Sequence, residues 1–245
     1  MKILGTILLR IYQIIIMLPS MLVATFITAT VVALGSICFG GKYWGYYPAK
    51  WWSKFMMWIS LCRVTVRREG NLDKTTSYIF VCNHQGAYDI FAIYGWLGHN
   101  FKWMMKQALR SIPMVGYACY RAGHIYVDKS SPSAIRHTME MAEKQLRGGM
   151  SVVVFPEGTR SKTGRLGNFK RGAYILAQEF NLPVVPVTID GSYSIMPITA
   201  KLPRPGHIIL TIHKPIEASE NGHDITDLID KSRKAIICAL PERNC

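Results

Sequence analysis

The sequence predicts an α/β protein, with a mixed, largely buried sheet flanked by helices and an N-terminal membrane-embedded helical segment. From about residue 77 onward, short apolar runs rich in β-branched residues alternate with helical patterns. The run from Ile11 to Gly41 has no charged residue and is longer than the roughly 20 apolar residues that cross a bilayer. A chain of 245 residues accommodates one such domain and a membrane appendage, but hardly two full domains.

Residues 1–65 are expected to form the membrane-associated segment. Lys2 and Arg10 precede the apolar run as in a signal peptide, but the run is about twice the usual length and has no suitable cleavage site, so we expect it to be retained. Pro19 and the glycines at 35, 40 and 41 are candidate breaks. The sequence is therefore compatible with one long tilted span or with a re-entrant helical hairpin.

Aromatic and basic residues follow the apolar run. The tryptophans are Trp44, Trp51, Trp52 and Trp58, and Lys50 and Lys54 stand among them. This composition is typical of a membrane interface, where indole rings lie at headgroup depth and lysines reach lipid phosphates. The heavier basic cluster lies on the C-terminal side of the run, which predicts that the following domain is on the cytoplasmic face of the cell inner membrane.

Residues 66–245 are expected to form the α/β domain. The predicted strands are 77–82, 101–105, 124–127, 151–155, 183–189 and 207–213, and the predicted helices are roughly 86–97, 132–147, 170–180 and 224–238.

Charge and motif content limit the classes of function. The 29 Lys+Arg against 15 Asp+Glu give a net charge of +14, so the partner is expected to be nucleic acid, an anionic membrane surface or a phosphorylated substrate. The 6 cysteines are scattered without a C-x-x-C pair. No P-loop, dinucleotide fingerprint, metal-ligand cluster or G-x-S-x-G elbow is present, which argues against a bound metal, a redox cofactor and a covalent serine mechanism.

The stretch "NHQGAYD", residues 83–89, joins a predicted strand to a predicted helix. It places His84 in a turn at the carboxyl edge of the sheet, where α/β proteins bind ligands, and Asp89 in the first helical turn, able to fold back toward the imidazole. Taken alone, the stretch favours a simpler interpretation, in which Asn83 caps the helix and Asp89 complements its dipole.

Two further stretches carry cations at expected strand ends. In "VVVFPEGTRS", a strand runs into Glu157, Gly158, Thr159 and Arg160, which could cradle a phosphate or form a solvated basic loop. In "KQALRSIPMVG", Lys106 and Arg110 share one side if the segment is helical.

A second histidine also has an acid close by in the sequence. His124 and Asp128 are four residues apart, but "HIYV" has the pattern of a packed strand. We therefore interpret His124 as a structural residue.

Together these stretches resemble the glycerophospholipid acyltransferase superfamily, most closely its bacterial 1-acyl-sn-glycerol-3-phosphate (lysophosphatidate) acyltransferases. Four motifs, in order, carry the resemblance: Asn83, His84 and Asp89; Lys106, Leu109, Pro113 and Gly116; "FPEGTRS" at 155–161; and Val185-Pro186-Val187. The resemblance covers about residues 70–215. It departs from the family in "GHIYVDK", where Tyr126, Val127 and Lys129 replace Phe, Ile and Arg.

The resemblance implies a reaction. His84 would be the general base that deprotonates the sn-2 hydroxyl of a lysophospholipid as it attacks an acyl thioester, and Asp89 would hold the imidazole tautomer. Lys106 and Arg160 would bind the acceptor phosphate. Glu157, with Gly158 and Thr159, would orient the arginine turn or the acceptor.

The resemblance also implies partners. The product would be phosphatidic acid, for phospholipid biosynthesis. The cosubstrate would be acyl-ACP or acyl-CoA, and no cofactor would be bound. The other partners would be the lysophospholipid and membrane lipids, and not nucleic acid. Two alternatives stay open. One is a sibling enzyme that acts on a lyso-aminolipid, lysophosphatidylethanolamine or glycerol-3-phosphate, and the other is a non-catalytic basic binder of membranes or nucleic acid.

Overall fold

The strands form one mixed sheet in the computed structural model, which describes residues 2–128, 130–147, 149–218 and 225–241. In this part of the chain the order is β1-β7-β6-β2-β5-β3-β4, and β6 and β7 are the antiparallel pair while the other neighbours are parallel. The strands are β1 (Cys62–Arg68), β2 (Ile79–Cys82), β3 (Phe101–Lys106), β4 (Ile125–Val127), β5 (Ser151–Val154), β6 (Val184–Asp190) and β7 (Gly206–Ile212).

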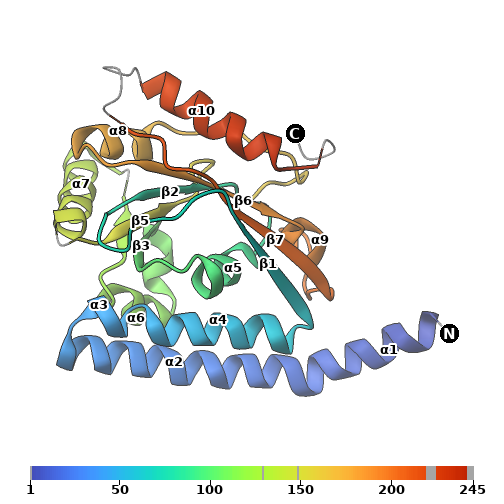
Figure 1. Ribbon diagram of the computed structural model, residues 1–245. Helices are drawn as coiled ribbons and strands as arrows, with labels where there is room; N and C mark the ends of the chain where they lie inside the picture. Colours follow the sequence, from blue (N-terminus) through green and yellow to red (C-terminus); the bar gives the residue numbers. More distant parts are fainter. Residues whose placement is uncertain (1, 129, 148, 219–224, 242–245) are drawn as a thin grey trace.

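Helices cover both faces of the sheet (Figure 1). The α-helices are α1 (Lys2–Tyr12), α2 (Leu18–Phe39), α3 (Gly41–Trp44), α4 (Tyr47–Ile59), α5 (Asp89–Trp96), α6 (Val115–Arg121), α7 (Pro132–Arg147), α8 (Gly172–Glu179), α9 (Ser192–Ile195) and α10 (Ile225–Cys238), with a π-helix η1 (Gln13–Met17) and a 3₁₀ helix η2 (Gln107–Ser111). Helices α4 and α5 lie on one face, and α7, α8 and α10 lie on the other.

The central strands are apolar because both of their faces are covered. In β2 all four residues are buried. Phe80 and Cys82 belong to the core under α5, whereas Ile79 and Val81 belong to the core under α8 and α10. This period of two, with both faces apolar, is typical of a sheet between helical layers. The expected mixed, largely buried sheet flanked by helices is confirmed.

The six expected strands and four expected helices are all present, with ends shifted by up to three residues. Lys129, the last residue of the "GHIYVDK" stretch, and residue 224, the first residue of the last expected helix, lie outside the described residues. Strand β1 was not predicted, because its basic residues were interpreted as part of an interfacial cluster. It pairs in parallel with β7 at the sheet edge, where charged side chains are tolerated, and it crosses the expected boundary between residues 65 and 66.

The N-terminal segment is a helical hairpin. Helices α1, η1 and α2 follow one another without a break, and the chain reverses at Gly40, whose φ of +87° is a conformation that glycine adopts readily. Helix α4 then runs back along α2 (Figure 1). Pro19 lies in the first turn of α2 and does not break the helix. Gly35 instead makes room for Trp44, whose ring would lie 2.4 Å from a Cβ at this position.

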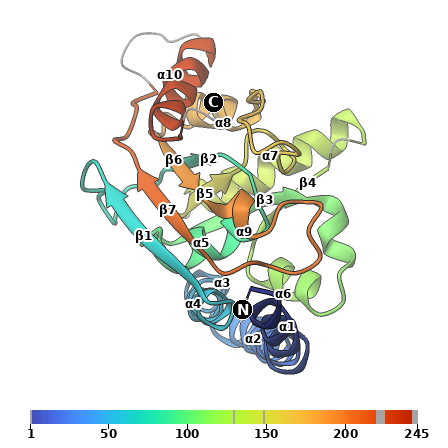
Figure 2. The same cartoon turned by 90° about the vertical axis from the view of Figure 1, so that its right-hand side faces the viewer.

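The hairpin is attached to the α/β domain along its length. Helix α4 packs between α2 and α5, and α2 packs against α6 (Figure 2). The buried Lys102 ammonium donates hydrogen bonds of 2.7 Å to the carbonyls of Gly41, in the hairpin turn, and Ala122, at the end of α6. Burial lowers the pKa of Lys102 to about 8.

The residues Leu4–Phe39 form a helix of 36 residues that is long and apolar enough to cross a membrane, by length and composition. Most of its large side chains are exposed, among them Leu22, Phe26 and Leu34. An apolar surface of this size associates a protein with a membrane rather than with water.

Candidate active site

His84 and Asp89 form a hydrogen-bonded pair in the turn between β2 and α5. His84 Nδ1 lies 2.7 Å from Asp89 Oδ2, and the same oxygen accepts bonds from the backbone N–H groups of Gln85 at 2.7 Å and Gly86 at 2.9 Å. Asp89 is fully buried, whereas the His84 side chain is 15% exposed. A carboxylate oxygen accepts hydrogen bonds, so the contact fixes the imidazole proton on Nδ1 and leaves the Nε2 lone pair for a substrate.

Asn83 does not cap α5. Its side chain bonds to the backbone of Ile189 in β6, donating to the carbonyl at 2.8 Å and accepting from the N–H at 2.7 Å. No side chain caps α5, which begins at Asp89 rather than near residue 86. The interpretation of "NHQGAYD" as only a capped helix start is therefore wrong.

Phe155 holds the other side of the imidazole. Its ring stacks on His84 with centroids 3.9 Å apart and planes at 11°, and Trp103 stacks on Phe155 at 5.4 Å. Sequence reasoning missed this contact, because an aromatic residue at the end of an apolar strand is more often part of the core. The ring pair limits rotation of the imidazole, which adds to the restraint by Asp89.

Glu157 joins the His84 turn to the following loop. Its carboxylate accepts bonds from the N–H of His84 at 2.7 Å and of Gly167 at 2.8 Å. Burial raises the pKa of Glu157, while the two backbone donors oppose this. The His84 carbonyl in turn accepts a bond of 2.7 Å from the N–H of Ser161. Both carboxylate oxygens of Glu157 thus accept backbone hydrogen bonds, an arrangement that holds the His84 turn and the Gly167 loop in place.

The turn after Glu157 exposes Thr159, half-buries Arg160 and requires Gly158, whose φ is +75°. A Cβ on Gly158 would lie 2.7 Å from Lys170 Nζ, so this cation lies directly over the turn.

Lys106 is the last residue of β3 and is exposed. Strand β3 runs parallel to β5 with Trp103 opposite Val153, a register that brings Lys106 beside the turn that follows β5. Lys106 and Arg110 were expected to share one side only if the segment is helical, and this condition is not met at Lys106, since η2 begins at Gln107. The guanidinium of Arg110 instead lies 4.6 Å from the ring centroid of Tyr120.

The loops at this edge carry cations that have no anionic partner. Within the part of the chain that the structure describes, the side chains of these residues form no hydrogen bond or salt bridge: Lys106, Arg160, Lys162, Arg165 and Lys170. Unpaired positive charges around a turn of backbone N–H groups favour an anionic ligand such as a phosphate. The described residues include no cluster of three His, Cys, Asp or Glu that could hold a metal ion.

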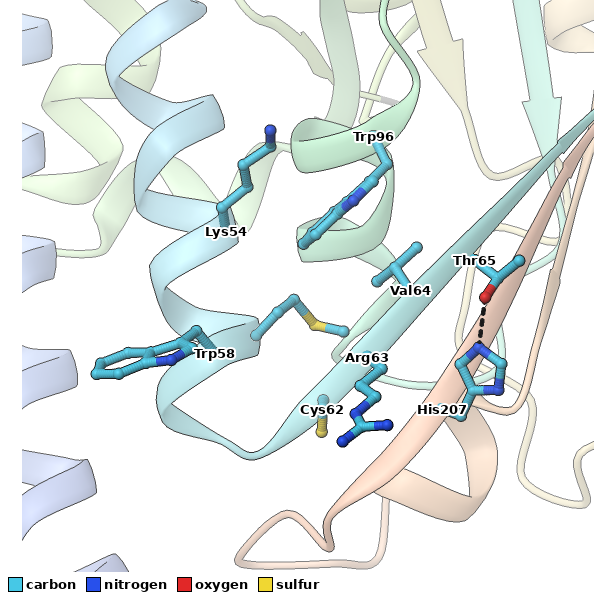
Figure 3. A pocket seen from close by; sticks show the side chains of 9 residues that line it. Lys54, Trp58, Cys62, Arg63, Val64, Thr65, Trp96 and His207 are labelled. Atoms are coloured by element: carbon cyan, nitrogen blue, oxygen red, sulfur yellow. Dashed lines mark hydrogen bonds between the residues drawn. The ribbon is translucent and has the colours of Figure 1, made fainter.

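A groove of about 650 Å³ lies elsewhere, between α4, β1 and the C-terminal end of α5 (Figure 3). It is lined by Lys54, Trp58, Arg63, Trp96 and His207 among others, and His207 Nε2 lies 2.8 Å from Thr65 Oγ1. Trp96 ends α5, whereas Asp89 begins it, so the groove is separate from the His84 turn.

Comparisons with known proteins agree with this geometry. A family model described as "Acyltransferase" matches residues 63–190. A chloroplastic 1-acyl-sn-glycerol-3-phosphate acyltransferase of Arabidopsis thaliana is 33% identical over 177 residues, which are 71% of this chain and 49% of the relative. The corresponding Helicobacter pylori protein is 31% identical over 76% of this chain and 78% of its own. The chain spans about half the length of its chloroplastic relatives from Arabidopsis thaliana and Brassica napus and of its Chlamydomonas reinhardtii relative.

A solved structure extends the likeness to the N-terminal hairpin. The crystal structure of the 1-acyl-sn-glycerophosphate (LPA) acyltransferase PlsC from Thermotoga maritima superimposes with a TM-score of 0.79 at 25% identity, over 96% of this chain and 95% of that chain. The match of the family model to more than half of the residues, together with the fold and the His84–Asp89 geometry, shows that the chain belongs to the acyltransferase family.

Proposed function

We propose that the protein transfers an acyl chain from a thioester to the sn-2 hydroxyl of 1-acyl-glycerol-3-phosphate, giving phosphatidic acid. The observation that carries this proposal is the His84 Nδ1–Asp89 Oδ2 hydrogen bond of 2.7 Å, at the sheet edge that also bears the unpaired Lys106 and Arg160. The relatives that carry this activity in their names support it.

His84 Nε2 accepts the hydroxyl proton as the sn-2 oxygen attacks the thioester carbonyl carbon. The tetrahedral intermediate then collapses, the C–S bond breaks, and the imidazolium returns the proton to the leaving thiolate. Asp89 stabilises the imidazolium while it exists. No acyl-enzyme forms, and no metal or cofactor takes part.

Arg160 and Lys106 bind the acceptor phosphate, since a guanidinium reads phosphate oxygens in a bidentate way and lysine supplies a point charge. Gly158 and Thr159 offer backbone N–H groups and a hydroxyl to the same group. Glu157 acts through the backbone of His84 and Gly167, and so positions the base and the loop rather than touching the acceptor.

The acyl donor is a coenzyme A or acyl-carrier-protein thioester that arrives from the cytosol. Both carriers are anionic, so the net charge of +14 favours their encounter with the protein.

The hairpin lies in the plane of the membrane instead of crossing it. The helix that bears Gln13 and Val32 touches the domain at both points, through the Gln13 bond of 2.7 Å to the carbonyl of Pro203 and through the packing of Val32 against α6. These residues are separated by about 30 Å of helix, which is the thickness of the hydrocarbon core. A crossing helix would therefore carry polar parts of the domain into hydrocarbon.

We propose the same division of the chain into a membrane segment, residues 1–65, and an acyltransferase domain, residues 66–245, with β1 crossing the boundary. We also propose that the domain lies on the cytoplasmic face of the inner membrane, which the heavier basic cluster after the apolar run supports.

The experiment is a competition among acceptors. Purified protein in vesicles receives a coenzyme A or carrier-protein thioester and equal amounts of lysophosphatidate, lysophosphatidylethanolamine and an uncharged lysolipid, and products are identified by mass spectrometry. Phosphatidic acid, acylated at sn-2, is the expected main product. Faster acylation of the uncharged acceptor would contradict the role of Arg160 and Lys106, and an absence of any product would contradict the reaction itself.

A further inference from the structure

The chain that leaves the catalytic edge after Lys106 is exposed over its whole length as far as Met114, although much of it is apolar. Helix α6 continues this surface. We call the five large side chains on it the 109–120 patch, with these exposed fractions: Leu109 41%, Ile112 43%, Met114 42%, Tyr117 53% and Tyr120 45%.

The patch is held outward by tight packing beneath it. A Cβ on Gly116 would lie 2.2 Å from the Arg110 carbonyl oxygen, so only glycine allows η2 to fold onto the start of α6. The Gly116 carbonyl also accepts a bond of 2.9 Å from the Tyr126 hydroxyl. The apolar side chains therefore point outward in a fixed arrangement, although burial would be favourable for each of them.

Helix α6 lies against the membrane hairpin. Ala118 and Ala122 pack on Ala29 and Val32 of α2. Tyr117 and Tyr120 of α6 stay exposed, and Figure 2 shows α6 beside α2. Leu34 and Ile37, which follow Val32 along α2, are exposed as well, so both of the packed helices carry exposed apolar side chains.

The charge of the residues around the 109–120 patch indicates what kind of partner binds it. The sequence contains no Asp or Glu between Asp89 and Asp128, whereas Lys106, Arg110 and Arg121 flank the patch. Exposed aliphatic side chains bordered by cations suit the headgroup region of an anionic bilayer, whereas the cations repel a basic protein and the aliphatic side chains offer no hydrogen bond to a nucleic acid.

We propose that the 109–120 patch inserts into the same anionic lipid surface as the hairpin and forms a second membrane contact directly beside the catalytic edge. A second part of this proposal rests on the proposed function. The lysophospholipid passes over the 109–120 patch on its way from the bilayer to Lys106, so its acyl chain leaves the hydrocarbon only close to His84.

The first test follows insertion without any need for activity. In a full-length variant with Cys38, Cys119, Cys238 and Cys245 replaced by serine, Ile112→Cys is labelled with an environment-sensitive fluorophore. Ile135→Cys on α7, which is 48% exposed, is the matched control. With phosphatidylcholine vesicles that also contain phosphatidylglycerol, the label at 112 is expected to shift to the blue and to resist an aqueous quencher, while the label at 135 stays quenchable.

Equal quenching at 112 and 135 in these vesicles would overturn the proposal. A blue shift at 112 that grows with protein concentration and needs no vesicles would overturn it in favour of a second copy of the chain as the occupant.

The second test measures the consequence for turnover. Leu109→Ser/Ile112→Ser/Met114→Ser is expected to raise the KM for a bilayer-embedded long-chain acceptor on the order of tenfold. The KM for a short-chain acceptor dissolved as monomers should not change, and Ile135→Ser/Ile175→Ser should change neither. An equal loss with both acceptors would contradict the passage of lipid over the patch. If no variant shows turnover, the proposed function fails, but the insertion result stands independently.

Discussion

His84 and His124 each have an acid close by in the sequence, and their surroundings differ. At the turn after β2, His84 Nδ1 is hydrogen-bonded to Asp89, and no described residue is hydrogen-bonded to its Nε2. At the start of β4, His124 is buried and uses both nitrogens, with the Tyr94 hydroxyl 2.8 Å from Nε2 and the Trp103 N–H 3.2 Å from Nδ1. Burial, and then the nearby Lys102 charge, lowers the pKa of His124 to about 3.

The difference shows what a histidine base needs besides an acid in the sequence. It needs an anion on one nitrogen, a free second nitrogen and some exposure, and His84 meets all three conditions. His213 is an intermediate case, since Glu69 lies 3.0 Å from its Nδ1 but Thr188 takes its Nε2 at 2.8 Å. The following predictions test this comparison.

His84→Ala is expected to have the largest effect on turnover. Removal of the base should lower kcat by about 10⁴-fold, the upper range for general-base catalysis. The thermal unfolding curve should change little, because Asp89 keeps its bonds from the backbone N–H groups of Gln85 and Gly86. Activity above a tenth of the wild-type value would contradict the role of His84 as the base, and with it the comparison of the two histidines.

Asp89→Asn should lower kcat by about 10²–10³-fold while the fold persists. The asparagine oxygen can take the place of Oδ2 and accept the same three bonds, but it carries no negative charge to stabilise the imidazolium. Rates of the variant and of wild type across pH, with CD spectra of both, provide the check. An unchanged kcat would mean that the negative charge of Asp89 does not matter at this site.

Arg160→Ala should act on the acceptor rather than on the base. The loss of a charge-assisted contact to phosphate is expected to raise the KM for lysophosphatidate by about 10–100-fold and to change kcat less. Arg136→Ala, at an exposed position of α7, is the matched control. A purely kcat effect in Arg160→Ala would assign the guanidinium to the transition state instead.

His124→Gln should have the smallest effect on turnover, with kcat near wild type at neutral pH. Its effect belongs to stability. Because the folded-state pKa of about 3 lies below the ordinary value of 6.5, the neutral His124 stabilises the fold above about pH 6.5, and this stability is lost as the pH falls toward 3.

Urea unfolding at several pH values checks this expectation. The wild-type protein should lose up to about 1.4 kcal/mol per pH unit more than the variant over that range. A loss of turnover like that of His84→Ala would mean that His124 belongs to the catalytic site.

The sequence predicted the layers of the fold and the ends of the motifs, because buried strands and capped or glycine-ended helices leave periodic patterns. It did not predict β1, since the alternation in "CRVTVRR" is partly hidden by edge-strand arginines that point to solvent. Helix α6 was missed as well, because Pro113 and Gly116 read as breaks, whereas Gly116 lies inside the helix and serves a close approach.

At the site, the sequence located His84, Asp89, Lys106 and the turn from Glu157 to Arg160, but not how they are joined. The stacking of Phe155 on His84, and the bonds from Glu157 to the His84 and Gly167 backbone, depend on how β2 and β5 are aligned. Such contacts between distant segments leave no local pattern in one sequence, and only a three-dimensional alignment reveals them.

The pairing of β1 with β7 has a consequence for biosynthesis. Residues 62–68 leave the ribosome directly after the hairpin, yet their partner strand is residues 206–212. Long-range parallel pairing forms late, whereas a helical hairpin forms from local contacts. The apolar hairpin is therefore complete well before the sheet can close, so the domain finishes folding beside a hairpin that is already available to a lipid surface.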